Sequence, residues 1–263
     1  NIDSDVARRM MSESADVIVR LLEADEPVSH NGEFWQFNDL RLQLKSYQHP
    51  RLPLALPTTG GGESLDMAAR HDMELWTPCG LNRPGGGVFT KIWSDFEEAC
   101  ERHDRTADRS RWHLVSNFYL ADTREKAWAD VSEGIMRETG YFLSIGFRPL
   151  YQAYEDQPIS EMTPQSVVER RDWVVGTPDD AIAWIQKKLE DNGDFGGVML
   201  TTHEWASSEK LRRSLELFAR YVIPRFNAGR YNYRAEADVL ANHFEKDGGV
   251  PLDVSGKSNI SGG

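Results

Sequence analysis

The sequence has 263 residues, of which 40% are hydrophobic and 27% charged, so it is long and apolar enough to fold around a core. Its formal net charge of −12 disfavours nucleic acid as a partner, because an acidic surface repels phosphate backbones. No apolar run reaches the ~18 residues of a membrane helix, and Cys79 and Cys100 lack the spacing of a zinc site or a disulfide scaffold. We therefore expect a cytoplasmic protein that binds no metal, nucleic acid or membrane.

The first expected elements are a helix and a small hairpin. Apolar residues recur at helical spacing from Val6 to Leu22, and Ser4 is placed to cap that helix. The turn signal His30-Asn31-Gly32 and the strand-like run at 33–37 predict a hairpin, which we place on the rim of the fold.

Four strand-and-helix units are expected to follow. The pattern predicts strands at 53–57, 75–77, 112–121 and 196–202. It predicts helices at 63–71, at 89–103, after a cap at Thr123, and at 208–222. This alternation implies a parallel sheet covered by helices, either a doubly wound open sheet or a closed eight-unit barrel.

The length of the chain bears on the choice between them. A complete barrel takes ~250 residues, whereas four units here use nearly the whole chain because of an insertion at about 140–171. A barrel therefore requires that about half of the strands precede Asn1, and a chain that opens on a helix fits that requirement. We expect the C-terminal part of a barrel domain at 1–226 and a partly disordered tail at 227–263.

A glycine-rich run, Thr59-Gly60-Gly61-Gly62-Glu63-Ser64, lies between the first of these strands and its helix. Glycines allow close backbone approach, and a helix start presents free N–H groups, so the run predicts an anion site that suits phosphate. It matches neither the P-loop nor the GxGxxG dinucleotide motif. The alternative is a flexible turn with no ligand.

Several motifs in their order and spacing resemble one family. They are residues 30–35, 40–47, 50–55, 60–64, 68–71, 108–110, 175–181 and 223–226. Over about 5–226 the sequence resembles the bacterial luciferase-like family of flavin-dependent monooxygenases, particularly its limonene-monooxygenase branch.

The resemblance implies a TIM-type (β/α)8 barrel, here a partial barrel with about the last four βα units, that binds reduced flavin mononucleotide (FMN) at the strand C-termini. It places the flavin phosphate on Thr59, Gly60, Gly61 and Ser64, and the isoalloxazine ring near the strand end from Trp76 to Cys79. Two positions depart from the family. Gly61 stands where a serine donor is frequent, and Asp72 stands where glycine is usual.

The activity implied by the resemblance is oxygenation of a small apolar organic substrate, with O2 as co-substrate and reduced FMN from a flavin reductase. A homodimer is a further implication. The family's catalytic base lies near early strands that this chain does not contain, so the fragment alone could be inactive. The alternatives are a deazaflavin-dependent oxidoreductase of the same fold and a non-catalytic flavin-binding fragment.

Other residues allow two interpretations each. His203, just after the last strand, is a weak catalytic candidate or a solvent-facing loop histidine. His113 faces either side of its strand. The aromatic residues in the insertion are expected either to form a lid over an apolar substrate or only to pack the insertion onto the barrel. They are Tyr141, Phe142, Phe147, Tyr151 and Tyr154.

Overall fold

A computed structural model describes residues 2–80 and 88–227. It opens on α1 (Ser4–Glu23), followed by a two-stranded antiparallel hairpin of β1 (Val28–Asn31) and β2 (Gln36–Leu40). The helix cap differs from the expectation, because the carboxylate of Asp3 accepts from Asp5 N at 2.9 Å and Ser4 is the first helical residue. The second strand also begins three residues later than the predicted run at 33–37.

Five strands form one parallel sheet, and they are β3 (Ala55–Pro57), β4 (Glu74–Pro78), β5 (Trp112–Leu120), β6 (Val174–Gly176) and β7 (Gly197–Thr201). The order β3-β4-β5 follows the chain. The long strand β5 also pairs with β7 along 113–117 and with β6 along 118–120. All four predicted strands are present, whereas β6 was missed because its three residues resemble a helix start.

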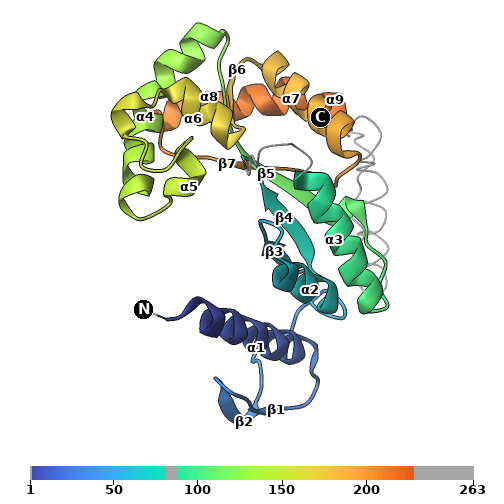
Figure 1. The fold of residues 1–263 in the computed structure, drawn as a ribbon. Helices are drawn as coiled ribbons and strands as arrows, with labels where there is room; N and C mark the ends of the chain where they lie inside the picture. The colour runs from blue at the N-terminus through green and yellow to red at the C-terminus, as the bar shows by residue number, and fades with distance from the viewer. Residues whose placement is uncertain (1, 81–87, 228–263) are drawn as a thin grey trace, which may run out of the picture.

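Helices cover one face of this sheet: α2 (Gly62–Arg70), α3 (Val88–Arg102), α7 (Pro178–Asn192) and α8 (Ser208–Leu217). Figure 1 shows α2 and α3 beside β3 and β4, with α7 near β6. Strand side chains facing these helices are buried in the main core, among them Leu56, Leu75, Trp112, Leu114 and Leu120. Parallel strands whose covering helices lie on one face make this a partial TIM-type (β/α)8 barrel, as expected, since a doubly wound sheet has helices on both faces.

The opposite, inner face of the sheet is only partly covered. Trp112 and Leu114 are fully buried against the helices, so the alternation of a strand turns His113 and Val115 to the inner face. Trp76, Pro78 and Met199 occupy equivalent inner positions on β4 and β7, and all five side chains are half-buried. His113 therefore faces the inner side of the sheet, which the sequence alone could not decide.

The insertion is helical and packs against α4 (Arg124–Ser144). It contains α5 (Arg148–Tyr151), a 3-10 turn at Ile159–Glu161 and α6 (Pro164–Arg171). Thr123 caps α4 as predicted, since its hydroxyl accepts from Lys126 N at 3.2 Å. A separate apolar cluster joins α4 and α6 around Val131, Ile135 and Val167.

The remaining elements complete the described chain. A 3-10 turn at Arg109–Arg111 precedes β5, and the predicted last helix is divided into α8, a π-helical turn at Phe218–Val222 and α9 (Ile223–Asn227). Within 2–80 and 88–227, no helix is both long and apolar enough to cross a lipid bilayer. Of the predicted tail at 227–263, Asn227 ends α9, and 228–263 lie outside the described residues.

Candidate active site

The carboxyl ends of the strands bring most of the predicted site residues to one rim. Because β3, β4, β5 and β7 are parallel, the segments that follow them emerge on the same side of the sheet. The glycine run follows β3, Cys79 follows β4, and His203 lies two residues beyond β7. In TIM-type barrels this rim carries the chemistry.

The glycine run forms an open loop at the start of α2. Gly61 is the N-cap, and no side chain of the described residues caps the helix. Leu65 N makes the first helical bond, to Gly61 O at 3.1 Å, so the amides of Gly62, Glu63 and Ser64 have no partner within the helix. Exposed N–H groups at a helix start provide both donors and a positive dipole end for an anion.

Gly60 shapes this loop without offering its own amide. Its φ of +91° requires glycine, and a Cβ atom here would lie 2.6 Å from Ile92 Cγ1. The Gly60 N–H donates to Thr58 Oγ1 at 3.0 Å, so it is already engaged. Thr59 and Gly61 are exposed. A ligand phosphate would therefore meet the amides after Gly60 rather than Gly60 itself.

The one acidic side chain in the glycine run, Glu63, is paired with a basic one. The carboxylate of Glu63, in the first turn of α2, lies 3.2 Å from the Nε atom of Arg8 in α1. The Ser64 hydroxyl lies close to Gly61, 3.8 Å from where a Cβ would stand. The guanidinium of Arg8 offsets the carboxylate that would otherwise repel an anion, and Ser64 adds a donor.

Trp76 and Cys79 belong to the neighbouring strand end. Trp76 is half-buried on the inner face, and its carbonyl accepts from Thr58 N at 2.9 Å, which ties β4 to the glycine loop. Cys79 is 1% exposed, and its N–H donates to Val115 O at 2.8 Å. Burial raises the pKa of the Cys79 thiol, so this side chain remains neutral and packs rather than reacts.

A cavity of about 160 Å³ opens at this rim, beside the middle of β5 and the ends of β4 and β7. Its lining combines strand residues with aromatic residues of the insertion: Pro78, Cys79, Val115, Ser116, Asn117, Phe142, Phe147, Leu150, Tyr151, Arg171, Trp173, Thr201 and His203. Asn117 and Thr201 hydrogen bond to each other and join β5 to β7 beneath it.

The aromatic residues of the insertion fall into two groups. Phe142 stacks on Tyr151 with ring centroids 5.6 Å apart and meets Phe147 at 5.5 Å, and all three line the cavity. Tyr141 and Tyr154 are 60% and 54% exposed and point elsewhere. Three of the five predicted lid residues therefore cover the cavity, and the other two do not.

His203 lies in the cavity wall and has a carboxylate partner that sequence reasoning missed. Its Nδ1 atom is 2.7 Å from Oε2 of Glu138, which also accepts from Trp205 Nε1 at 2.7 Å. Glu138 is on α4, far earlier in the chain, and nothing in its local sequence marks it. Because Nδ1 faces the carboxylate, the other ring nitrogen, Nε2, is the atom left for a ligand.

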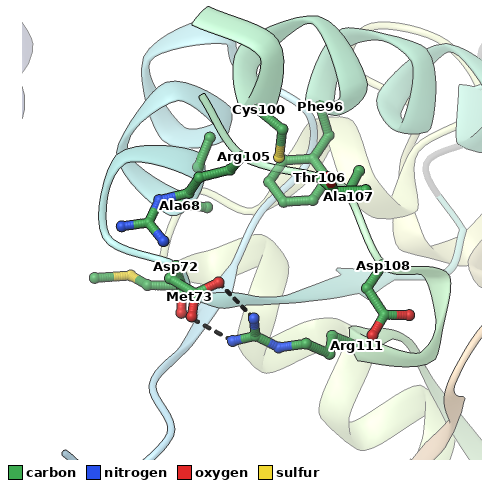
Figure 2. Close-up of a pocket in the computed structure, with 11 residues that line it drawn as sticks. Ala68, Asp72, Met73, Phe96, Cys100, Arg105, Thr106, Ala107, Asp108 and Arg111 are labelled. Atoms are coloured by element: carbon green, nitrogen blue, oxygen red, sulfur yellow. Dashed lines mark hydrogen bonds and ion pairs between the residues drawn. The ribbon is translucent and has the colours of Figure 1, made fainter. Parts of the chain in front are cut away.

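The opposite rim holds a different pocket, shown in Figure 2. It lies between α2, α3 and the turn before β5, and Arg111 Nη1 lies 2.5 Å from Asp72 Oδ1 across it. Asp72, just after the end of α2, has a φ of +49°, which lies in the left-handed region. Glycine adopts this region readily, and it is the residue usual at this position in the family that the sequence resembles. Residues at the amino ends of barrel strands serve stability rather than chemistry.

A family model described as luciferase-like monooxygenase matches residues 1–194. The chain is 33% identical over 229 residues to 4-hydroxyprotoasukamycin monooxygenase of Streptomyces nodosus subsp. asukaensis, covering 86% of this chain and 61% of that protein. It is 29% identical over 226 residues to limonene 1,2-monooxygenase of Rhodococcus erythropolis, covering 86% and 56%. The chain thus spans less than two thirds of either relative.

Solved structures share the fold at low identity. The monooxygenase RslO1 of Streptomyces bottropensis aligns with a TM-score of 0.64 at 23% identity, over 86% of this chain and 63% of that one. The FMN-bound oxygenating constituent of 3,6-diketocamphane monooxygenase of Pseudomonas putida gives 0.59 at 18%, over 82% and 63%. An F420-dependent secondary alcohol dehydrogenase gives 0.60 at 16%, over 84% and 63%.

Proposed function

The chain belongs to the luciferase-like monooxygenase family, and from this premise we propose that it uses reduced FMN and O2 to oxygenate a small organic substrate. The observation that carries this proposal is the uncapped, exposed first turn of α2 on the same rim as the aromatic cavity. One feature suits the phosphate end of a flavin, and the other suits an apolar substrate beside its ring.

Different residues of the rim would bind the phosphate and the ring of the flavin. The backbone amides from Gly61 to Ser64, with the Ser64 hydroxyl, would hold the phosphate. Gly60 shapes the turn, and Thr59 borders it. Trp76 and Cys79 would flank the flavin ring from β4. When bound, reduced flavin supplies the electrons that activate O2.

The cavity residues would control the surroundings of the reaction. Phe142, Phe147 and Tyr151 would exclude water from the substrate side. His203, held through Nδ1 by Glu138, would present Nε2 as a hydrogen-bond acceptor that holds or moves a substrate proton. A flavin reductase would supply the reduced cofactor, and we expect a homodimer in the cytoplasm.

A deazaflavin-dependent oxidoreductase is the second candidate, because an F420-dependent dehydrogenase has the same fold. The two sequence relatives are both monooxygenases, which favours the first candidate. Supplying reduced FMN or reduced F420 under O2 separates them, with limonene as an uncharged trial substrate and benzoate as an anionic one. Product oxygen from O2 with FMN supports the proposal, whereas substrate turnover with F420 alone would replace it.

Flavin binding gives the more direct test, since the chain could bind flavin without catalysing a reaction. Riboflavin lacks the phosphate that the glycine loop would hold, so FMN is expected to bind at least about tenfold more tightly, as charge-assisted hydrogen bonds of this kind require. Quenching of flavin fluorescence measures both affinities. Equal affinities for FMN and riboflavin would remove the loop from the site.

A further inference from the structure

Arg171 is a charged side chain in an otherwise largely apolar cavity wall. Its guanidinium carbon lies 5.2 Å from the ring centroid of Tyr151 and 5.4 Å from that of Trp173, and all three residues line the cavity. Burial lowers the pKa of Arg171, but a guanidinium remains protonated at neutral pH. The cavity therefore contains a fixed, partly desolvated positive charge between two aromatic rings.

The hydrogen-bonding capacity of this cation is not used up. Within the described residues, the buried Nε and Nη1 atoms of Arg171 have no hydrogen-bond partner. The carboxylate of Glu138 acts on Arg171 through its charge but is not hydrogen bonded to it. Its Oε2 atom accepts from Trp205 and lies beside His203, and its buried Oε1 atom has no partner among the described residues. Leaving buried donors of a charged group unpaired is costly, so the arrangement favours an acceptor supplied by a ligand.

The backbone beneath Arg171 is held firmly in place. It ends α6, and the next residue, Asp172, has a φ of +53° and accepts at its carbonyl from Ser116 Oγ at 2.9 Å. The Asp172 carboxylate accepts from Trp184 Nε1 at 2.8 Å and pairs with Lys188, so it does not neutralise Arg171. On the other side, Gly80 packs so closely on the Arg171 backbone that a Cβ atom would collide with it.

We propose that Arg171 determines substrate specificity by binding an anionic oxygen, a carboxylate or phenolate, on a ligand whose ring-sized apolar body lies against Phe142, Tyr151 and Trp173. This inference rests on the proposed function, because it takes the cavity as the place of the substrate. It narrows the expected substrate from an apolar compound to an apolar compound with one oxyanion. An uncharged hydrocarbon would fill the space but leave the guanidinium donors unpaired.

Benzoate and benzamide are suitable probes, because they have nearly the same shape and differ in charge. Their dissociation constants at neutral pH are measured by the fluorescence of the tryptophans near the cavity. Benzoate is expected to bind the unaltered chain at least about tenfold more tightly than benzamide, as a charge-assisted pair requires. In Arg171→Met this preference is expected to vanish, and in Arg171→Lys to shrink several-fold.

Arg148→Met is the matched control. Arg148 is an exposed arginine of the same insertion, paired with Asp156 at 3.6 Å, and it does not line the cavity. Its replacement should leave the preference for benzoate unchanged. Equal affinity of the unaltered chain for both probes, binding of neither, or a preference that survives in Arg171→Met would overturn the proposal. If Arg171→Met fails to fold by circular dichroism, the probe preference of the unaltered chain and of Arg171→Lys decides.

FMN affinity measured on the same proteins separates this inference from the proposed function. Unchanged FMN binding in Arg171→Met, with benzoate preference lost, supports a substrate contact. A parallel loss of FMN affinity would overturn the assignment, because Arg171 would then serve the flavin. A benzoate preference in a chain that binds no flavin would support the anion site and remove the flavoenzyme proposal.

Discussion

His203 and Glu138 lie against each other in the cavity wall, with Nδ1 of the imidazole 2.7 Å from Oε2 of the carboxylate. Trp205 Nε1 donates to the same oxygen at 2.7 Å, so one carboxylate orients two aromatic side chains. Trp205 is 5% exposed and its ring stacks on that of His203. The pair therefore joins the segment after β7 to α4 and leaves Nε2 as the ring nitrogen of His203 that does not face Glu138.

Glu138→Leu is expected to lower the free energy of unfolding by about 1–3 kcal/mol, because it leaves the buried Trp205 Nε1 without its acceptor and removes the carboxylate beside His203. Urea denaturation followed by tryptophan fluorescence measures the change. Glu133→Leu, at an exposed position of the same helix, serves as the control and should change stability little. Equal losses in the two variants would mean that the pair contributes nothing specific.

Gly60→Val is expected to weaken FMN binding at least about tenfold, since valine at a φ of +91° is strained and its Cβ would press on Ile92. Fluorescence titration measures the dissociation constant well below the unfolding temperature. Riboflavin provides the comparison within the same variant, because its binding does not depend on a phosphate contact. An unchanged FMN affinity would contradict the proposed role of the loop.

Gly134→Ala is expected to destabilise the chain by about 1–3 kcal/mol, although alanine is favoured over glycine in an isolated helix by about 1 kcal/mol. Gly134 is buried in α4, and a Cβ atom there would collide with the backbone of Trp205. Gly140→Ala in the same helix would meet only the end of the Ile159 side chain, at 3.4 Å. Thermal unfolding should therefore rank Gly140→Ala as the more stable variant, and the reverse order would disprove this packing argument.

Asp180 is expected to make stability depend on pH in the acid range. Arg124 hydrogen bonds to its carboxylate at 3.0 Å and, together with a bond from Thr177 N at 2.8 Å, lowers the pKa of Asp180 to about 2. A lowered folded-state pKa stabilises the fold above the unfolded value of 3.8, and this contribution is lost as pH falls from about 4 to about 2. The difference in pKa corresponds to about 2 kcal/mol.

The measurement compares urea unfolding of the unaltered chain and Asp180→Asn between pH 6 and pH 2.5. The two curves should be separated at pH 6 and converge toward pH 2.5. Asp179→Asn, at the exposed neighbouring position, should track the unaltered chain throughout. A gap between the unaltered chain and Asp180→Asn that stays constant over this range would show that the carboxylate charge has no such role.

Much of the fold could be predicted from local pattern. Short apolar runs placed β3, β4, β5 and β7 within a few residues, and Thr123 was identified as the cap of α4. The strand β6 was missed because three residues are too few to show a strand periodicity. It is formed by pairing with the end of β5, a long-range contact that local pattern does not contain. The helix cap moved from Ser4 to Asp3, a choice between adjacent capping residues that pattern alone cannot rank.

The candidate site divides in the same way. The glycine loop could be recognised because its chemistry lies within six consecutive residues between a strand and a helix. Glu138 and Arg171 could not, because their partners are distant in the sequence: Glu138 meets Trp205, and Arg171 lies on the rings of Tyr151 and Trp173. Their surroundings depend on how the insertion packs over the strand ends.

The sequence by itself determined the alternation of strands and helices, the open turn before α2 and the aromatic content of the insertion, because backbone preference and capping act over a few neighbouring residues. Only the tertiary structure decided which charged groups lose their water. Whether Arg171 faces solvent or a cavity, and whether His203 meets a carboxylate, depends on every segment that packs around it. Desolvation is summed over the whole fold, so no local pattern contains it.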